Sequence, residues 1–305
     1  TELTATTTTL ASPDPTLGPR DVPPDPPLPP PSISSDARVV VSPRGIVTTV
    51  LKPEGSGWQV RTPCGNTASL ASGKGIVNTA IVLDPGHGGD EPGATSPDKS
   101  LSEAKLNLAV AKEAAASLEM QGYSVLLTRT SDYRITLESR AAVVNALKPK
   151  AFVSIHHNAD ADSPRDTPGT ETYYQNASAD SKRLAGLVYE EVYRTLSIYH
   201  PGWIGDRDAG VKYRLNSSGD DYYGILRRTK GVPSTLAELA FISNQNEADL
   251  LRTPEVQRVE GDAVARGSIR YLTTSDPGSG FVQGYARSSP AGPGGGGQGC
   301  VDPRL

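Results

Sequence analysis

The sequence predicts an α/β protein with a small β module on its N-terminal side. Two observations lead to this class. Between residues 76 and 275, short apolar runs alternate with longer stretches whose apolar residues recur at helical spacing, whereas residues 37–75 hold only short β segments. Alternating strands and helices imply an open α/β sheet, in which functional side chains collect at the carboxyl ends of the strands.

The first strand and the first helix of the larger region have clear signals. Ala80–Asp84 is an apolar run that ends in a glycine-rich turn, as expected of a buried parallel strand. The next element runs from Ser102 to Gln121, where Leu106 and Leu118 lie on one helical face and a glycine follows as a stop. The sequence therefore predicts a strand, a glycine-rich loop and a helix in succession.

The remaining elements continue this alternation. We predict strands at Tyr123–Thr128, Ala151–Ile155, Gly169–Tyr174 and Thr235–Leu239, and helices at Leu137–Leu147, Asp180–Leu196 and Pro254–Leu272. In the β module, the predicted segments are Val39–Val41, Ile46–Leu51, Trp58–Val60 and Ala68–Leu70. A module of so few residues is small for a hydrophobic core of its own, and we expect it to pack against the larger domain.

The composition of the two ends sets the predicted domain boundaries. Residues 1–36 are rich in threonine and proline and predict a disordered arm, and residues 276–305 predict a flexible glycine-rich tail. Between them lie the β module (37–75) and an α/β catalytic domain (76–275). A disulfide between Cys64 and Cys300 would staple the tail to the module, and the alternative is two independent thiols.

Composition and charge exclude several classes of function. No apolar run of about 18 residues exists, so the sequence predicts no membrane span. The net charge of -4 and the absence of basic runs argue against nucleic acid as a partner. The chain starts without Met and without a basic-then-apolar leader, so we expect an exported protein whose signal peptide is already removed.

Two of the four histidines directly follow predicted strands. His87 lies in a glycine-rich turn after the first strand, and His156 follows Ala151–Ile155, so both should reach one rim of the sheet. Either histidine alone could equally be a hydrogen-bonded loop or core residue. Glu103, just inside the first helix, is a candidate third ligand of a catalytic zinc site with histidine and carboxylate ligands. The alternative is that an acid in the first turn complements the helix dipole.

Glu238 stands in an otherwise apolar strand. Burying a charge there is costly unless the group is paired or functional. A carboxylate near a zinc site can act as a general base. The alternative is a buried structural ion pair with Arg129 or Arg140.

Five ordered motifs carry a resemblance to a known family. They are Asp84–Gly89, Leu101–Leu108 around Glu103, Leu127–Arg129, Ser154–Ala159 and Glu238–Asn244. Over about residues 80–273 the chain resembles the zinc-dependent N-acetylmuramoyl-L-alanine amidases of the cell-wall hydrolase type. The resemblance implies a mostly parallel six-stranded sheet flanked by helices.

The resemblance also implies roles for individual residues. The zinc ligands of the family fall on His87, Glu103 and His156, and its catalytic glutamate falls on Glu238. Asn158 matches a common asparagine of the family that orients the site, with local capping of the loop as the alternative. His157 stands where the family often has a small residue, and whether it reaches the substrate is open.

A charged stretch before the last predicted strand resembles the substrate-side loop of the family. Arg207, Lys212 and Arg227 are therefore candidates for contacts with carboxylates of a peptide substrate, and a solvated charged loop is the alternative for each. No long apolar helical stripe occurs between Ile198 and Lys230, so the sequence predicts no helix that occludes the zinc site.

The function implied by the resemblance is zinc-dependent hydrolysis of the amide bond between N-acetylmuramic acid and the L-alanine of the peptidoglycan stem peptide. Peptidoglycan is then the partner, and protein partners stay unidentified. Two rivals remain open: a catalytically silent relative that binds peptidoglycan or regulates wall synthesis, and a zinc peptidase or other amidohydrolase that acts on a different amide.

Overall fold

The computed structural model describes residues 35–159, 169–200, 203, 210–278, 284–286 and 299–305. The chain divides into a first unit, residues 1–32, and a second unit that runs from Ile33 to Leu305. The first unit lies outside the described residues, and the predicted Thr/Pro-rich arm lies there except for its last two residues. All that follows concerns the second unit.

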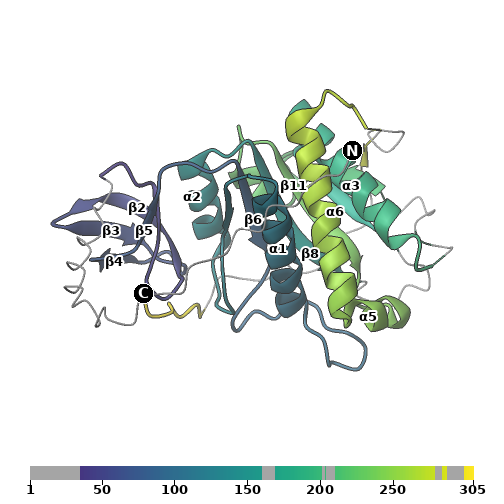
Figure 1. Ribbon diagram of the computed structural model, residues 1–305, viewed down its shortest axis with the longest axis horizontal. Coiled ribbons are helices and arrows are strands. Elements are labelled where there is room, and N and C mark those ends of the chain that lie inside the picture. Colours follow the sequence, from purple (N-terminus) through teal and green to yellow (C-terminus); the bar gives the residue numbers. More distant parts are fainter. Residues whose placement is uncertain (1–34, 160–168, 201–202, 204–209, 279–283, 287–298) are drawn as a thin grey trace, which may run out of the picture. The chain divides into compact units, whose positions relative to one another are not determined.

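Its larger part is an α/β fold around a mixed sheet (Figure 1). The strand order is β12-β10-β9-β11-β8-β6-β7. In chain order the strands are β6 (Ile81–Pro85), β7 (Val125–Leu127), β8 (Ala151–Asn158), β9 (Glu171–Tyr174), β10 (Gly210–Tyr213), β11 (Ser234–Phe241) and β12 (Tyr285–Ala286).

The sheet differs from the mostly parallel, six-stranded sheet that the resemblance implied. It has seven strands among the described residues, because β12 pairs with β10. It is mixed because β9 pairs antiparallel with β11. β9 begins at the edge of the sheet where β8 ends, since Glu238 of β11 is in register with both Glu171 and His156. A parallel neighbour would need a crossover that first returns the chain to the opposite edge.

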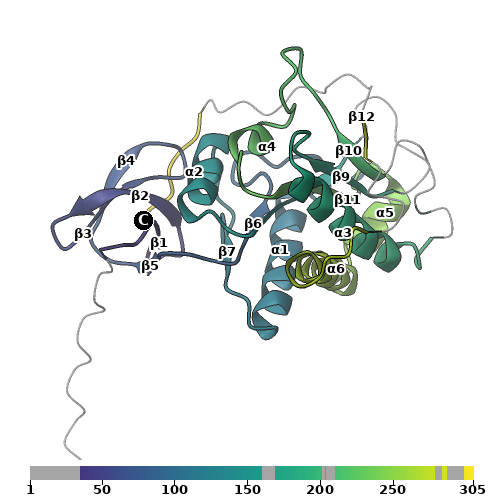
Figure 2. The ribbon, with the colours of Figure 1, turned by 90° about the horizontal axis from the view of Figure 1, so that it is seen from above.

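Helices cover both faces of this sheet (Figure 2). One face carries α1 (Glu103–Met120), α3 (Ala179–Leu196) and α6 (Pro254–Thr273), and the other carries α2 (Leu137–Leu147) and α4 (Gly224–Arg228). A short helix, α5 (Gln245–Leu251), follows β11. Each face has its own apolar core, with Leu83 and Val110 in one and Phe152 and Val144 in the other.

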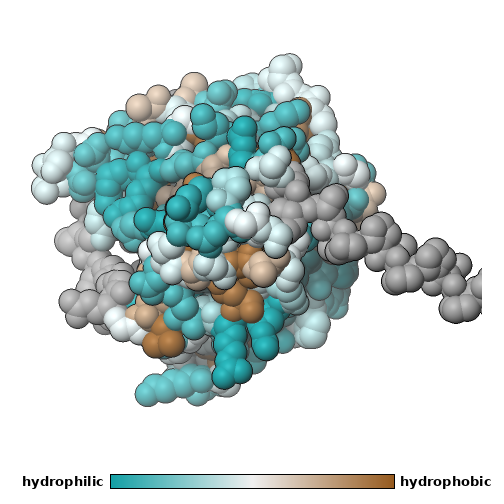
Figure 3. Space-filling model, turned by 90° about the vertical axis from the view of Figure 1, so that its left-hand side faces the viewer, coloured by the Kyte–Doolittle hydropathy of each residue, from teal (hydrophilic) through white to brown (hydrophobic). Residues whose placement is uncertain are grey.

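The N-terminal module is an antiparallel sheet of order β4-β3-β2-β1-β5. Its strands are β1 (Val39–Val41), β2 (Val47–Glu54), β3 (Gly57–Arg61), β4 (Thr67–Leu70) and β5 (Lys74–Ile76). Val39 and Val47 belong to the same apolar cluster as Val144 of α2, so the module shares a core with the larger domain. The face of the molecule on this side is mostly hydrophilic, with small apolar spots (Figure 3).

The described parts of the C-terminal segment are packed against the rest of the unit. Cys64 and Cys300 form a disulfide with a Cα–Cα distance of 5.6 Å. Beyond it, the Asp302 carboxylate accepts hydrogen bonds from the Cys64 amide and the Thr62 hydroxyl, both at 2.8 Å. The side chain of Leu305 packs against the core of the β module. The predicted disulfide is therefore formed, whereas the domain boundaries stay a prediction.

No helix in the described part of the chain is both long enough and apolar enough to cross a membrane.

Candidate metal centre at the carboxyl edge of the sheet

His87 is presented by a sharp turn at the end of β6. Its φ is 58°, a left-handed conformation that is uncommon for residues other than glycine. Gly86 lies so close to the His156 ring that a Cβ at this position would come within 2.1 Å of it. The turn therefore depends on a glycine before the histidine, and its strained backbone holds the imidazole over the end of β8.

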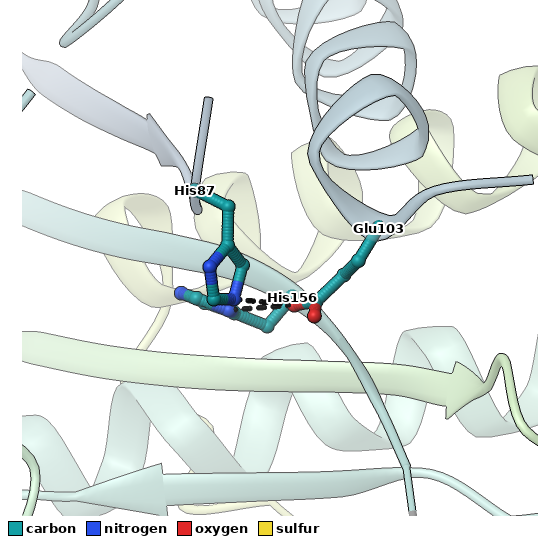
Figure 4. Close-up of side chains that lie close together, drawn as sticks. All are labelled: His87, Glu103 and His156. Atoms are coloured by element: carbon teal, nitrogen blue, oxygen red, sulfur yellow. Dashed lines mark hydrogen bonds and ion pairs between the residues drawn. The ribbon is translucent and has the colours of Figure 1, made fainter. Parts of the chain in front are cut away.

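Glu103 joins the two histidines. It is the first residue of α1, and its Oε1 lies 3.2 Å from Nε2 of His87 and 2.9 Å from Nδ1 of His156 (Figure 4). The two imidazoles meet edge to face, with their centroids 5.1 Å apart. One potential ligand atom of each of the three residues lies within 4.8 Å of the others. The turn after β6, the start of α1 and the strand β8 thus bring together three side chains that are separated in the sequence.

The electrostatics favour an ionised carboxylate at the centre of this cluster. Burial by itself raises the pKa of Glu103, but the two histidines outweigh it and hold the pKa well below its usual range. Burial also lowers the pKa of His156, which favours the neutral imidazole, whereas for His87 the effect of burial is outweighed by Glu103 and Glu91, which raise its pKa. An anionic carboxylate and a neutral imidazole are the ligand forms that bind a metal ion.

A second buried carboxylate anchors the strand ends behind the cluster. Asp84 of β6 accepts hydrogen bonds from Arg140 Nη1 (2.6 Å), Thr128 Oγ1 (2.5 Å) and Ser154 Oγ (2.8 Å). The Arg129 guanidinium donates to the carbonyls of Pro85, Gly86 and Ala104. Sequence reasoning did not assign this anchoring role to Asp84, although it is the one ionisable residue in the β6 apolar run.

Glu238 lies beside the cluster on the neighbouring strand. Its Cα is in register with His156 on β8, and the pairing of β11 and β8 shifts by one residue before Phe241. Paired residues of adjacent strands point to the same face, so the half-buried Glu238 is on the face that carries His156. Arg129 and Arg140, its suggested alternative partners, are engaged with Asp84 and the backbone carbonyls of the turn.

The predicted substrate-contacting residues are spread over different surroundings. Asn158 donates from Nδ2 to Glu171 Oε2 (2.9 Å), and Lys212, 1% exposed, forms an ion pair with the same carboxylate. Arg227 donates to the carbonyls of Asp221 and Tyr222 and lines a pocket with Val232, near the amino end of β11. Arg207 lies outside the described residues. Glu171, which sequence reasoning missed, is in register with Glu238.

His157 points away from the cluster. β8 extends to Asn158, three residues beyond its predicted end, so His156 and His157 project to opposite faces. The His157 side chain is fully buried behind the sheet, between α1 and α6. The His157 side chain is therefore not exposed at the edge of the sheet that carries His87, Glu103 and His156.

Two histidines, a buried glutamate and a second glutamate at the carboxyl edge of an α/β sheet form the arrangement expected of a metal-dependent hydrolase. The family profile described as N-acetylmuramoyl-L-alanine amidase (Amidase_3) matches residues 81–270. The chain therefore belongs to this family of enzymes.

Two individual relatives and one solved structure are similar to this chain, and of these the second relative and the solved structure are named as N-acetylmuramoyl-L-alanine amidases. The chain is 34% identical to YqiI of Bacillus subtilis over 220 residues, 70% of this chain and 97% of that protein. It is 31% identical to the N-acetylmuramoyl-L-alanine amidase AmiC of Neisseria meningitidis, over 64% of this chain and 53% of AmiC. The solved N-acetylmuramoyl-L-alanine amidase of Clostridium difficile superposes with a TM-score of 0.56 at 28% identity, covering 65% of this chain and 99% of that structure.

Proposed function

We propose that this chain hydrolyses, with the help of zinc, the amide bond between N-acetylmuramic acid and the L-alanine of the stem peptide, and so takes part in cell-wall remodelling, cell separation or lysis. The observation that carries the proposal is the cluster of His87, Glu103 and His156 with Glu238 in register beside it. Membership in the amidase family supports the choice of bond.

The three clustered residues suit zinc. Catalytic zinc sites use three protein ligands of histidine and carboxylate type and leave one position open. His87, Glu103 and His156 supply this donor set from a turn, a helix start and a strand. When bound, zinc supplies a Lewis acid that polarises an amide carbonyl and lowers the pKa of water.

Glu238 is the proposed general base. Its carboxylate takes the proton from the attacking water and delivers it to the nitrogen of the departing L-alanine. Asn158, Lys212 and Arg227 remain proposed substrate contacts, together with Arg207 outside the described residues. Asn158 and Lys212 share the partner Glu171, which is in register with Glu238.

The location of the substrate leads to a proposal about the compartment. We propose an extracytoplasmic enzyme of the cell wall or periplasm. The disulfide between Cys64 and Cys300 fits an oxidising compartment. The arm (1–36), the β module (37–75), the catalytic domain (76–275) and the tail (276–305) stay as proposed divisions.

Product analysis tests the function. Purified muropeptides of known structure are digested with the wild type, with Glu238→Gln and with Glu255→Gln, which changes an exposed glutamate at the start of α6. We expect a free lactyl sugar and an intact stem peptide that begins with L-alanine from the wild type and from Glu255→Gln. A cut within the stem peptide would favour the peptidase reading, and binding without any product would favour the silent relative.

A further inference from the structure

A buried histidine–glutamate pair lies directly behind the proposed metal centre. His157 Nε2 lies 3.4 Å from Oε1 of Glu260 on α6, and both side chains are 0% exposed. The other oxygen of Glu260 is buried without a hydrogen-bond partner among the described residues. Placing such groups in an apolar core costs stability, because both lose their hydration. A purely stabilising role therefore explains the pair poorly.

The pair is connected to the metal centre through Asn107. The Asn107 Nδ2 donates to Oε1 of Glu103 and to the Gly86 carbonyl, both at 3.3 Å. Its side-chain amide is thereby oriented with Oδ1 toward His157 Nδ1, 2.7 Å away, so Nδ1 of His157 is the donor. The His157 backbone amide also donates to Glu103 Oε1, at 3.3 Å.

The packing of α6 brings Glu260 to this position. The next residue, Gly261, is so close to α1 that a Cβ there would come within 2.7 Å of the Ala114 backbone nitrogen. Three elements therefore contribute to a line of four residues: Glu260 comes from α6, His157 from β8, and Asn107 and Glu103 from α1.

We propose that His157 and Glu260 are positioning residues of the metal centre: they fix the Asn107 amide, which fixes the carboxylate of Glu103 from behind the sheet. This inference rests on the proposed function, since it assumes that Glu103 is a metal ligand. Groups that orient metal ligands typically change metal affinity or activity about 10- to 100-fold when removed. His157 thus acts on the metal without contacting it.

The test compares zinc affinity in four folded proteins, by competition with a chromophoric chelator. His157→Ala removes the bond to Asn107, whereas His157→Asn places an amide NH2 near the former Nδ1 and keeps a donor for Asn107. Val264→Ala is the control. It removes methyl groups from the apolar core around α6, and Val264 takes no part in the contacts that join Glu260, His157, Asn107 and Glu103. We expect zinc binding about 10- to 100-fold weaker in His157→Ala. His157→Asn keeps the donor for Asn107 but loses the contact with Glu260, so its loss should be smaller. The affinity of Val264→Ala should be close to that of the wild type.

Cobalt-substituted protein supplies a second readout. Its visible absorption reports ligand geometry, so His157→Ala should shift the bands and His157→Asn should shift them less. If His157→Ala does not fold, Glu260→Ala, which removes the α6 end of the line, carries the same expectation of weaker zinc binding.

Three results would overturn the inference: unchanged affinity and spectrum in His157→Ala, or in Glu260→Ala where that variant replaces it; equal weakening in Val264→Ala; or no rescue by His157→Asn. In each of these cases a wild type that binds zinc and cleaves the amide leaves the proposed function standing. A wild type that binds no zinc would overturn both.

Discussion

At the residue scale, the buried acids around the centre differ in what faces them. Asp84 faces the guanidinium of Arg140, and Glu171 faces the ammonium of Lys212. Glu103 faces two imidazoles, which are themselves metal ligands when neutral. Of these three carboxylates, Glu103 is therefore the one whose partners can share a metal ion with it.

Asp84 predicts a pH dependence of stability. Burial raises its pKa, but Arg140 and the bonds from Thr128 and Ser154 outweigh this and place the pKa below its usual range. The unfolded group, with a pKa of about 3.9, binds a proton before the folded group does. The stabilisation is therefore present above pH 4 or so and is lost as the pH falls through the folded pKa.

Urea unfolding between pH 6 and pH 3 checks this prediction. The wild type should lose stability steeply at the acid end, and Asp84→Asn, less stable throughout, should show a flatter profile. Parallel profiles for the two proteins would mean that Asp84 does not titrate differently in the folded state.

The substitution Lys212→Ala tests whether the buried ion pair between Lys212 and Glu171 stabilises the fold. Breaking a buried ion pair by removing one partner costs about 3–5 kcal/mol, so Lys212→Ala should lower the free energy of unfolding by that amount. Arg258→Ala, which removes an exposed pair with Asp262, is the control and should cost less than about 1 kcal/mol. Unchanged stability of Lys212→Ala with a raised KM would instead assign Lys212 to the substrate alone.

At the element scale, α6 is held against its neighbours by small residues. A Cβ on Gly261 would come within 2.8 Å of the Val110 carbonyl oxygen, and one on Gly267 within 2.6 Å of the Val188 Cα. These contacts are with backbone atoms, which cannot turn aside as a flexible side chain can. The glycines therefore set the distance of α6 from α1 and α3.

Gly261→Ala should consequently destabilise the protein. Alanine favours a helix over glycine by about 1 kcal/mol, but the overpacking against α1 costs about 1–3 kcal/mol, and the clash with backbone should win. Thermal unfolding measures the balance, with Lys112→Ala at an exposed position of α1 as the control. A higher Tm for Gly261→Ala than for the wild type would show that α6 and α1 move apart enough to accommodate the added methyl group.

Most elements were predictable because their signals are local. The bounds of α2 match the prediction, α1 is one residue shorter than predicted at each end, and α3 and α6 are each one residue longer at one end. β5, β10, β12, α4 and α5 were missed, since segments of two to seven residues show too few periods to recognise. The antiparallel direction of β9 could not be predicted from its own residues, because it depends on the edge of the sheet at which the chain enters the strand.

The candidate site was predictable to a similar degree. His87, Glu103 and His156 were picked from strand ends and motifs, and the structure brings them together. The roles of Asn107, His157 and Glu260 depend on how α1 and α6 pack behind β8, a long-range contact that no single segment encodes.

At the scale of the whole second unit, the two ends of the described chain meet at the β module. The Cys64–Cys300 disulfide closes a loop over a sequence separation of 236 residues. The module also shares an apolar core with α2. We therefore expect the β module, the segment that the disulfide holds against it and the larger α/β domain to unfold in one transition.

Removing the disulfide should therefore lower the stability of the larger domain as well as that of the β module. The double variant Cys64→Ser, Cys300→Ser is expected to lose about 2–5 kcal/mol, because closure of a long loop no longer limits the unfolded chain. Urea unfolding followed by near- and far-ultraviolet circular dichroism measures this, and the reduced wild type should match the variant. A separate early transition with an unchanged main transition would contradict the shared core.

The proposed centre divides its work between two sets of residues: His87, Glu103 and His156 bind the metal, and Glu238 transfers the proton. Zinc content and muropeptide hydrolysis, measured together on the wild type, Glu238→Gln and Glu103→Ala, test it most directly. We predict one zinc per chain in the wild type and in Glu238→Gln, hydrolysis that is about 10²- to 10⁴-fold slower in Glu238→Gln, and loss of both zinc and hydrolysis in Glu103→Ala. Full zinc binding by Glu103→Ala, or unimpaired hydrolysis by Glu238→Gln, would contradict the account.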